Sequence, residues 1–255
     1  MSSSSSQRAA LTQFMQFTQT PERTAKKILQ ANNWNLELAI DSYYQNPNTS
    51  SGSGPTSQGS IHAIFDQYRQ PEDSPDTLTI AGTMAYFEAL GLQVEDVTVV
   101  PLSKALGSES MGEFTRQGFT DGWMQLGADS LPKMQEKLRE LRQSLDTDED
   151  YFKDVYKWVF GWAKPAGTKA LPLESAIEWW RLLLQSRFGD NGHLERWAEF
   201  LESKWKKSIP KDTWNMFYEF ILSAKADPTL TGYDEHGSYP STIDAYVDYY
   251  RNQEQ

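Results

Sequence analysis

Apolar residues recur at steps of three and four residues along almost the whole sequence after Ile61. A charged stretch in the middle of the chain carries five of them on one helical face: Leu131, Met134, Leu138, Leu141 and Leu145. No alternating stretch longer than four residues indicates a strand, and residues 77–80 could form only a short pairing. This period predicts an all-α protein with about ten helices in its larger domain.

The sequence divides into two helical segments joined by a flexible one. Residues 7–47 contain short apolar stripes separated by turn signals, which predicts a three-helix bundle near the lower size limit for independent folding. Residues 48–60 are rich in Ser, Gly, Asn and Thr, a composition typical of a flexible linker. We therefore expect a small domain over residues 7–47, a linker over 48–60 and a larger helical domain over 61–252.

The absence of cysteine from all 255 residues removes several kinds of chemistry. Disulfides, thiolate nucleophiles and the cysteine-based zinc sites of RING-type ligases are excluded. The net charge of −11, from 35 acidic and 24 basic residues, argues against a nucleic-acid partner, because phosphate binding requires a basic face. The apolar runs are too short to span a bilayer, and the N-terminus lacks a signal pattern. We expect an intracellular protein of the nucleus and cytoplasm, with no membrane partner.

The sequence predicts neither a metal site nor a catalytic centre. The segment from Asp73 lies between two predicted helices, as an EF-hand loop does. However, Pro75 replaces an oxygen-rich ligand, and Met84 stands where the bidentate Glu belongs. The three histidines are far apart, and neither a Gly-x-Ser-x-Gly nor a His-Glu-x-x-His run is present. We therefore expect no calcium ion and no other cofactor, and a hydrolase is disfavoured.

The C-terminal region contains two helix starts that carry acidic residues. Pro210 and Pro240 each suit the first turn of a helix, where a missing N–H is no loss. The apolar stripes that follow are Trp214, Phe217, Tyr218 and Ile221 in the first helix, and Ile243, Tyr246, Val247 and Tyr250 in the second. Asp212 and Asp244 fall outside these stripes, so we expect both carboxylates to face water.

These two helix starts belong to a recognisable motif. Residues 209–215 read Ile-Pro-Lys-Asp-Thr-Trp-Asn, and residues 233–244 contain Tyr-Asp-Glu, a Gly, an aromatic-Pro pair and Ile-Asp. The motif resembles the end of the PONY domain, found in the defective-in-cullin-neddylation family of cullin-neddylation ligases. The resemblance implies that Asp212, Ser238 and Asp244 bind a basic winged-helix end of a cullin beside its acceptor lysine. The family has Ala at the middle position, and a hydroxyl buried unpaired there would cost about 1 kcal/mol or more.

The same resemblance implies an apolar pocket for the acetylated N-terminal Met of the neddylation conjugating enzyme. The matching residues here are Val99, Leu102, Leu106, Phe114, Trp162, Trp179 and Leu182. Acetylation removes the α-amino charge, so burying that terminus no longer desolvates an ammonium group. The alternative is that these side chains are ordinary core. Adjacent Trp179 and Trp180 cannot share one helix face, which favours the pocket, whereas Thr83, Met111 and Gly112 depart from the family pattern.

The N-terminal bundle carries a second resemblance. Residues 14–18, Phe-Met-Gln-Phe-Thr, precede an Asn-Asn-Trp turn and an Ala-Ile-Asp-Ser-Tyr-Tyr helix, and together they look like a ubiquitin-associated (UBA) domain. The resemblance implies that an apolar patch binds ubiquitin, and the matching residues are Met15, Phe17, Ile40, Tyr43 and Tyr44. The alternative is that Met15 and Phe17 belong to the core of a small bundle.

Together, the resemblances imply a scaffold-type ligase for cullin neddylation without catalytic residues of its own. It would bind the cullin and the charged conjugating enzyme at once, which raises their effective concentration and improves their orientation. The covalent chemistry would belong to the cysteine of the conjugating enzyme. We expect the protein to be a monomer. The alternative function is a non-catalytic ubiquitin-binding adaptor whose larger domain only docks another protein.

Overall fold

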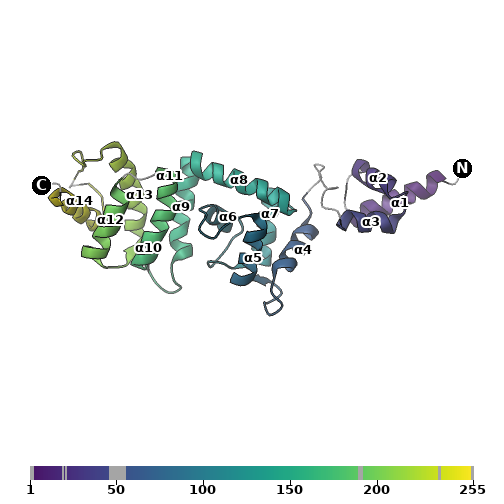
Figure 1. Cartoon of the computed structure of the whole chain (residues 1–255), viewed down its shortest axis with the longest axis horizontal. Helices are drawn as coiled ribbons and strands as arrows, with labels where there is room; N and C mark the ends of the chain where they lie inside the picture. Colours follow the sequence, from purple (N-terminus) through teal and green to yellow (C-terminus); the bar gives the residue numbers. More distant parts are fainter. Residues whose placement is uncertain are drawn as a thin grey trace. The chain divides into compact units, whose positions relative to one another are not determined.

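The computed structural model describes residues 3–18, 20, 22–45, 56–188, 192–234 and 237–253. Its contacts divide the chain into two compact units, residues 1–57 and 58–255. The described chain is mostly helical, with only two-residue strands (Figure 1), and the predicted all-α fold is confirmed. No helix in these described ranges is long and apolar enough to cross a membrane.

The small unit is a bundle of helices α1 (Ser3–Thr18), α2 (Glu22–Ala31) and α3 (Leu36–Gln45). Each helix contacts the other two. The buried apolar residues are Phe14, Ala25, Ile28, Leu29 and Ala39. The turn before α3 has left-handed backbone at Asn33 and Trp34, with φ of 51° and 62°. Helix α1 begins at Ser3, before the boundary that we expected at residue 7.

The first half of the larger unit contains helices α4 (Gln58–Tyr68), α5 (Ile80–Leu90), α6 (Val99–Ala105), α7 (Arg116–Leu126) and α8 (Leu131–Thr147). Strands β1 (Thr77–Leu78) and β2 (Phe114–Thr115) pair antiparallel, with Leu78 opposite Phe114. The short pairing expected within residues 77–80 is therefore present. Helix α4 includes residues 58–60, which we had assigned to the linker.

Helices α6 and α7 approach each other unusually closely in this half. A Cβ atom added at Gly122 in α7 would lie 2.4 Å from the carbonyl oxygen of Ala105 and 2.7 Å from a methyl group of Leu106. Such distances are shorter than van der Waals contact, so only glycine fits there. The close approach keeps Leu102 and Leu106 fully buried in the core of this half.

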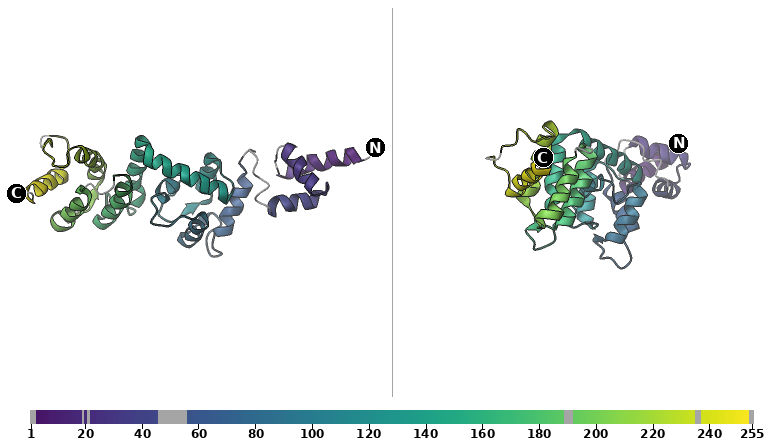
Figure 2. Two further views of the ribbon diagram at one scale, coloured as in Figure 1. Left: turned by 45° about the horizontal axis from the view of Figure 1, so that its top comes forward. Right: turned by 60° about the vertical axis from the view of Figure 1, so that its left-hand side comes forward.

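The second half contains helices α9 (Glu149–Ala163), α10 (Leu173–Trp180), α11 (Ser186–Phe188), α12 (His193–Phe200), α13 (Lys211–Ala226) and α14 (Ser241–Gln253). The π-helical turns η2 (Arg181–Gln185) and η3 (Leu201–Trp205) extend α10 and α12. Strand β3 (Ala170–Leu171) pairs antiparallel with β4 (Ile209–Pro210), which leads into α13. Figure 2 shows these helices side by side, and α13 contacts α9, α12 and α14.

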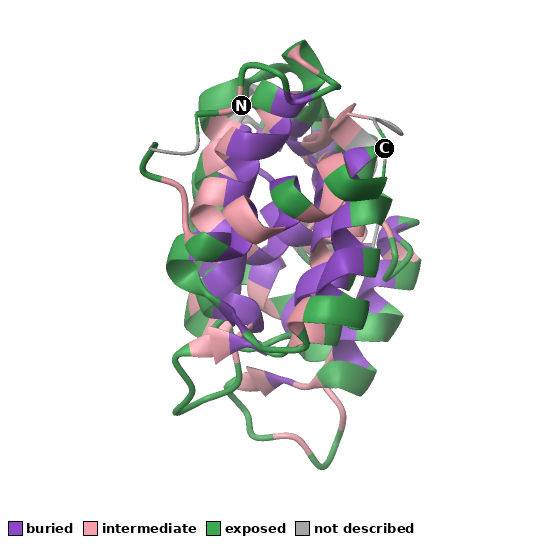
Figure 3. Ribbon diagram, turned by 90° about the vertical axis from the view of Figure 1, so that its left-hand side faces the viewer, coloured by how far each residue is buried: buried purple, intermediate pink, exposed green. Residues whose placement is uncertain are grey.

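An aromatic cluster joins α9, α10 and α13 in the core of the second half, where the buried residues lie between the helices (Figure 3). The rings of Trp180 and Trp214 stack at 5.2 Å. Tyr156 donates its hydroxyl to the Trp214 carbonyl at 2.6 Å and accepts from Trp180 Nε1 at 2.8 Å. These polar atoms are therefore satisfied although they are buried, which lets the cluster fix the angle between the three helices.

Candidate functional site

Asp212 lies in the first turn of α13 with an exposed side chain. The chain on both sides of it is anchored, because Ile209 in β4 and Trp214 in α13 are fully buried. A carboxylate in the first turn is stabilised by the positive end of the helix dipole. The expectation that Asp212 faces water is confirmed, and its carboxylate is available to a partner.

Asp244 occupies the equivalent place in α14 but is half-buried. Ile243, Tyr246 and Val247 bury the opposite face of the helix. The hydroxyl of Tyr233 donates to Asp244 Oδ1 at 2.6 Å. Our expectation that Asp244 simply faces water is therefore only partly right, because one carboxylate oxygen is engaged by the protein.

Ser238 lies exposed in the loop between α13 and α14. Its neighbour Tyr239 stacks on Tyr233, with ring centroids 5.4 Å apart. The stacked pair thus links the two positions, because Tyr239 follows Ser238 in the chain and Tyr233 binds Asp244. Asp212 is held separately, at the start of α13. Because Ser238 is exposed, its hydroxyl is open to solvent rather than buried.

The residues expected to form the apolar pocket fall into two groups. Leu102, Leu106 and Phe114 are fully buried in the core of the first half, and Val99 is partly buried against them. The other three come from the second half: Trp162 is 8% exposed, and Trp179 and Leu182 are partly buried. The ordinary-core alternative therefore describes the first three side chains. The remaining ones keep some exposed surface.

A hydrogen bond connects the two groups. Trp162 Nε1 donates to Ser108 Oγ at 3.0 Å, and Ser108 lies in the loop that follows α6. The Trp162 ring packs on Trp179 at 5.5 Å and stacks on Trp158 at 4.9 Å. Ser108 and Trp158 were not predicted, although Trp158 could have been found as the residue four positions before Trp162 in a helix. Trp180 is fully buried while Trp179 is not, which confirms that the two rings occupy different faces.

Three exposed apolar side chains on the first half were also missed, and we call them the α5 patch: Ile80, Met84 and Met111. A Cβ atom at Gly112 would lie 3.0 Å from Ile80 Cγ1, so the loop carrying Met111 lies against α5. Thr83, on the same helix, is buried, and its hydroxyl has no partner in the described structure. The four-residue spacing of Ile80 and Met84 was the available signal for this patch.

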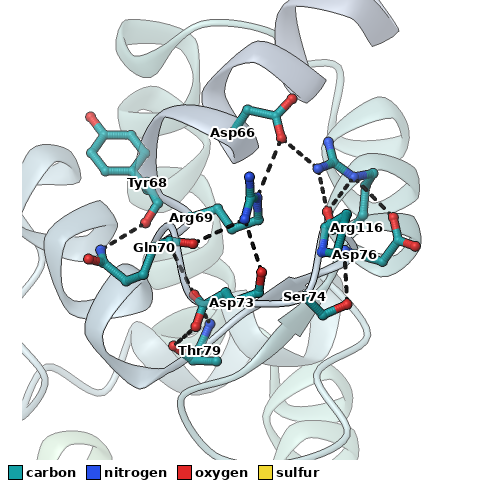
Figure 4. Close-up of polar contacts among 10 residues, drawn as sticks. Asp66, Tyr68, Arg69, Gln70, Asp73, Ser74, Asp76, Thr79 and Arg116 are labelled. Carbon is teal, nitrogen blue, oxygen red and sulfur yellow. Dashed lines mark hydrogen bonds and ion pairs between the residues drawn. The ribbon is translucent and has the colours of Figure 1, made fainter.

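The EF-hand-like segment after α4 is organised by its own side chains (Figure 4). Asp73, placed first in that loop, accepts the hydroxyl of Thr79 at 2.8 Å and the backbone N–H of Gln70 at 3.1 Å. These bonds lower the pKa of Asp73, since they stabilise its charged form. Arg69 Nη1 donates to the carbonyl oxygens of Gln70 and Asp73, both at 3.0 Å.

Arg116, from the start of α7, binds Asp76 of this segment and Asp66 of α4. Its Nη2 lies 2.5 Å from Asp66 Oδ1, and its Nε lies 3.3 Å from Asp76 Oδ1 and 3.0 Å from the Pro75 carbonyl oxygen (Figure 4). The guanidinium also lies 4.5 Å from the centre of the Phe65 ring. Within the loop, arginine side chains thus bind the Asp76 carboxylate and the carbonyl oxygens of Gln70, Asp73 and Pro75, whereas the Asp73 carboxylate is bound by Thr79 and Gln70. Among the described residues, no group of three or more His, Cys, Asp or Glu could hold a metal ion.

The residues expected to bind ubiquitin differ in exposure. Phe17 is 65% exposed, whereas Met15, Ile40 and Tyr43 are partly buried against the core of the small unit. Tyr43 contacts Phe14 edge-on at 5.8 Å. The core alternative therefore suits Met15 better than Phe17. The side chain of Tyr44 lies outside the described part of the chain.

Two family models match the sequence. The one described as "Cullin binding" matches residues 133–249, and the one described as "UBA-like domain" matches residues 8–50. The chain is also similar to proteins named "Defective in cullin neddylation protein 1". The protein from Yarrowia lipolytica is 38% identical, over 92% of this chain and 93% of the relative.

Two other relatives with the same name are less similar to the chain. The relative from Pyricularia oryzae is 31% identical over 96% of this chain and 93% of its own length. The relative from Caenorhabditis elegans is 31% identical over 97% of this chain and 90% of its own length. Identity at this level over nearly the whole of both chains includes both helical units. The chain therefore belongs to the defective-in-cullin-neddylation family.

Proposed function

We propose that this protein promotes cullin neddylation as a scaffold that binds two partners at once. Asp212, Ser238 and Asp244 bind the basic winged-helix end of a cullin. The apolar side chains at the junction of the two halves bind the acetylated N-terminus of the conjugating enzyme. The protein contributes no nucleophile, and the absence of cysteine agrees with that role.

The observation that carries the proposal is the pair of acidic helix starts at Asp212 and Asp244. Both lie within residues 133–249, the part that matches the model described as "Cullin binding". Both stand in the first turn of a helix whose opposite face is locked in the core. A carboxylate on a rigid helix is suited to bind a Lys or Arg side chain of a partner, because the backbone that carries it need not become ordered on binding.

The exposure of some predicted pocket residues supports the proposed site for the conjugating enzyme. Leu102, Leu106 and Phe114 are buried in the core of the first half, while Trp179 and Leu182 of the second half keep partly exposed surface that a peptide could contact. An apolar site of this kind favours an acetylated terminus over a charged one. A peptide that docks as a helix needs only complementary apolar surface from its host.

The rate effect comes from proximity. A scaffold that holds the thioester and the acceptor lysine together replaces a bimolecular encounter by one governed by effective concentration. It also restricts the relative orientation of the two reacting groups. Both effects require the two sites to be occupied at the same time, so loss of either site abolishes the acceleration.

The test is a reconstituted transfer of the modifier to a C-terminal cullin fragment, with the acetylated conjugating enzyme. We expect this protein to accelerate transfer and the Asp212→Ala/Asp244→Ala variant to lose that acceleration. The matched control is Glu88→Ala/Glu136→Ala, which removes the same charge from exposed positions on α5 and α8. If the protein does not accelerate transfer at all, the ligase function is wrong and the ubiquitin-binding adaptor remains.

The small unit supports a separate interaction with ubiquitin, because it matches the UBA-like model and exposes Phe17. We infer that this interaction recruits the protein without taking part in transfer. A monomeric state and a distribution between nucleus and cytoplasm complete the proposal. Light scattering and fluorescence microscopy of the tagged protein test these two points.

A further inference from the structure

Tyr233 makes a directed contact with one of the proposed cullin-binding carboxylates. Its hydroxyl donates to Asp244 Oδ1 at 2.6 Å, a distance typical of a strong hydrogen bond to a charged acceptor. Burial, followed by the hydrogen bond to Asp244, raises the pKa of Tyr233 well above its ordinary value. The hydroxyl therefore remains a donor throughout the physiological pH range.

The loop that carries Tyr233 has a closed network of its own. The carboxylate of Asp227 accepts the backbone N–H of Gly232 at 2.7 Å and the hydroxyl of Thr229 at 3.0 Å. The hydroxyl of Thr231 lies 3.3 Å from both of its oxygens. These bonds close the loop immediately before Tyr233, so that its backbone has few alternative conformations.

The same loop is attached to the neighbouring helices. The Pro228 carbonyl accepts His193 Nε2 of α12 at 2.8 Å and the hydroxyl of Tyr250 of α14 at 3.1 Å. The Leu230 carbonyl accepts Arg251 Nη2 at 3.0 Å. The Leu230 side chain is 3% exposed, although its φ of 53° is unfavourable for leucine. An unfavourable backbone conformation persists only where the surroundings hold it in place.

The ring of Tyr233 is held as firmly as its backbone. It stacks on Tyr239 at 5.4 Å, and both rings pack edge-on against Phe220 of α13, each at 6.1 Å. Because these contacts fix the ring, they also fix the direction of the Tyr233 hydroxyl, which points at Asp244 Oδ1. The hydrogen bonds of Asp227, Pro228 and Leu230 hold the backbone of residues 227–232 without involving Asp244.

We propose that Tyr233 is a positioning residue that holds Asp244 ready for a basic side chain of the cullin. This inference rests on the proposed function. One carboxylate oxygen is bound by Tyr233, while the second oxygen and the remaining lone pairs of the first stay available to a Lys or Arg. Holding the carboxylate in place before binding removes part of the ordering loss that an unrestrained Asp would suffer. Tyr233 touches no reacting atom.

The test is a double-mutant cycle on the affinity for a C-terminal cullin fragment, measured by titration calorimetry with the full chain. Tyr233→Phe keeps the stacked ring and removes only the hydroxyl. We expect the affinity to fall about three- to tenfold, the range expected when one side chain must be ordered on binding. In an Asp244→Ala background, Tyr233→Phe should have no further effect, because the group on which it acts is absent.

Tyr250→Phe is the matched control, since it removes a hydroxyl that anchors the same loop but does not reach Asp244. Its effect should be the same in both backgrounds. An equal loss for Tyr233→Phe in both backgrounds would show a direct or general structural contribution and overturn the inference. No loss for Tyr233→Phe, with a clear loss for Asp244→Ala, would overturn the inference and leave the proposed function intact. No loss for Asp244→Ala would remove Asp244 from the interface and overturn both.

Discussion

Replacing Arg116 with methionine should destabilise the larger unit and leave that unit unresponsive to calcium. Methionine keeps an apolar stem over Phe65 but removes the ion pairs with Asp66 and Asp76 and the hydrogen bonds to Pro75. The side chains of the two aspartates are 53% and 80% exposed, so the ion pairs contribute little. With the carbonyl bond and the cation–π contact, we expect a loss of about 2 kcal/mol. In a unit of this size that corresponds to a melting temperature lower by about 4–8 °C.

The assay is thermal melting followed by circular dichroism, with calcium and with a chelator. Arg139→Met is the control, because Arg139 is exposed on α8 and lies away from this loop. Its melting temperature should be close to that of the unaltered protein. The pKa of Asp66 is lowered chiefly by its hydrogen bond to Arg116. The stability contributed by this ion pair is therefore present at neutral pH and is lost as the pH falls through the lowered pKa. A melting temperature of Arg116→Met equal to that of the control, or restored by calcium, would refute the reasoning.

Three further predictions concern the core, the small unit and acid stability. Trp180→Phe should lower the free energy of unfolding in urea by about 2–4 kcal/mol, because it leaves a void and removes the donor to the Tyr156 hydroxyl. A loss below about 1 kcal/mol would contradict the packing argument. Phe17→Ala should weaken ubiquitin binding in an NMR titration without unfolding the small unit, whereas Phe14→Ala should unfold it. Burial lowers the pKa of His193 from its ordinary value of 6.5. The stability that neutral His193 contributes is therefore complete above pH 6.5 and is lost as the pH falls toward the lowered pKa. His193→Gln should flatten the pH dependence of the unfolding free energy in this range.

Local sequence patterns were sufficient for the helical character of the chain, although they placed the starts of α1 and α4 several residues too late. The spacing of Trp214, Phe217, Tyr218 and Ile221 reflects the turn of a helix, which is a local property of the chain and needs no knowledge of neighbours. All four side chains are buried in α13 as that spacing requires. For the same reason Asp212, outside the stripe, could be placed on the surface in advance. The absence of cysteine likewise excluded thiol chemistry without any structure.

The details of the site depended on contacts between residues far apart in the chain. Periodicity separates Asp244 from the buried face of α14, but it cannot reveal that Tyr233 reaches across the loop to bind it. It also cannot show that Arg116 lies against Asp66, fifty positions earlier in the chain. Helical spacing is the same for a residue that lines a pocket and for one that fills a core, so spacing alone could not separate Leu102 from Trp179. Tertiary packing decided between them, because burial depends on which other helices cover each face.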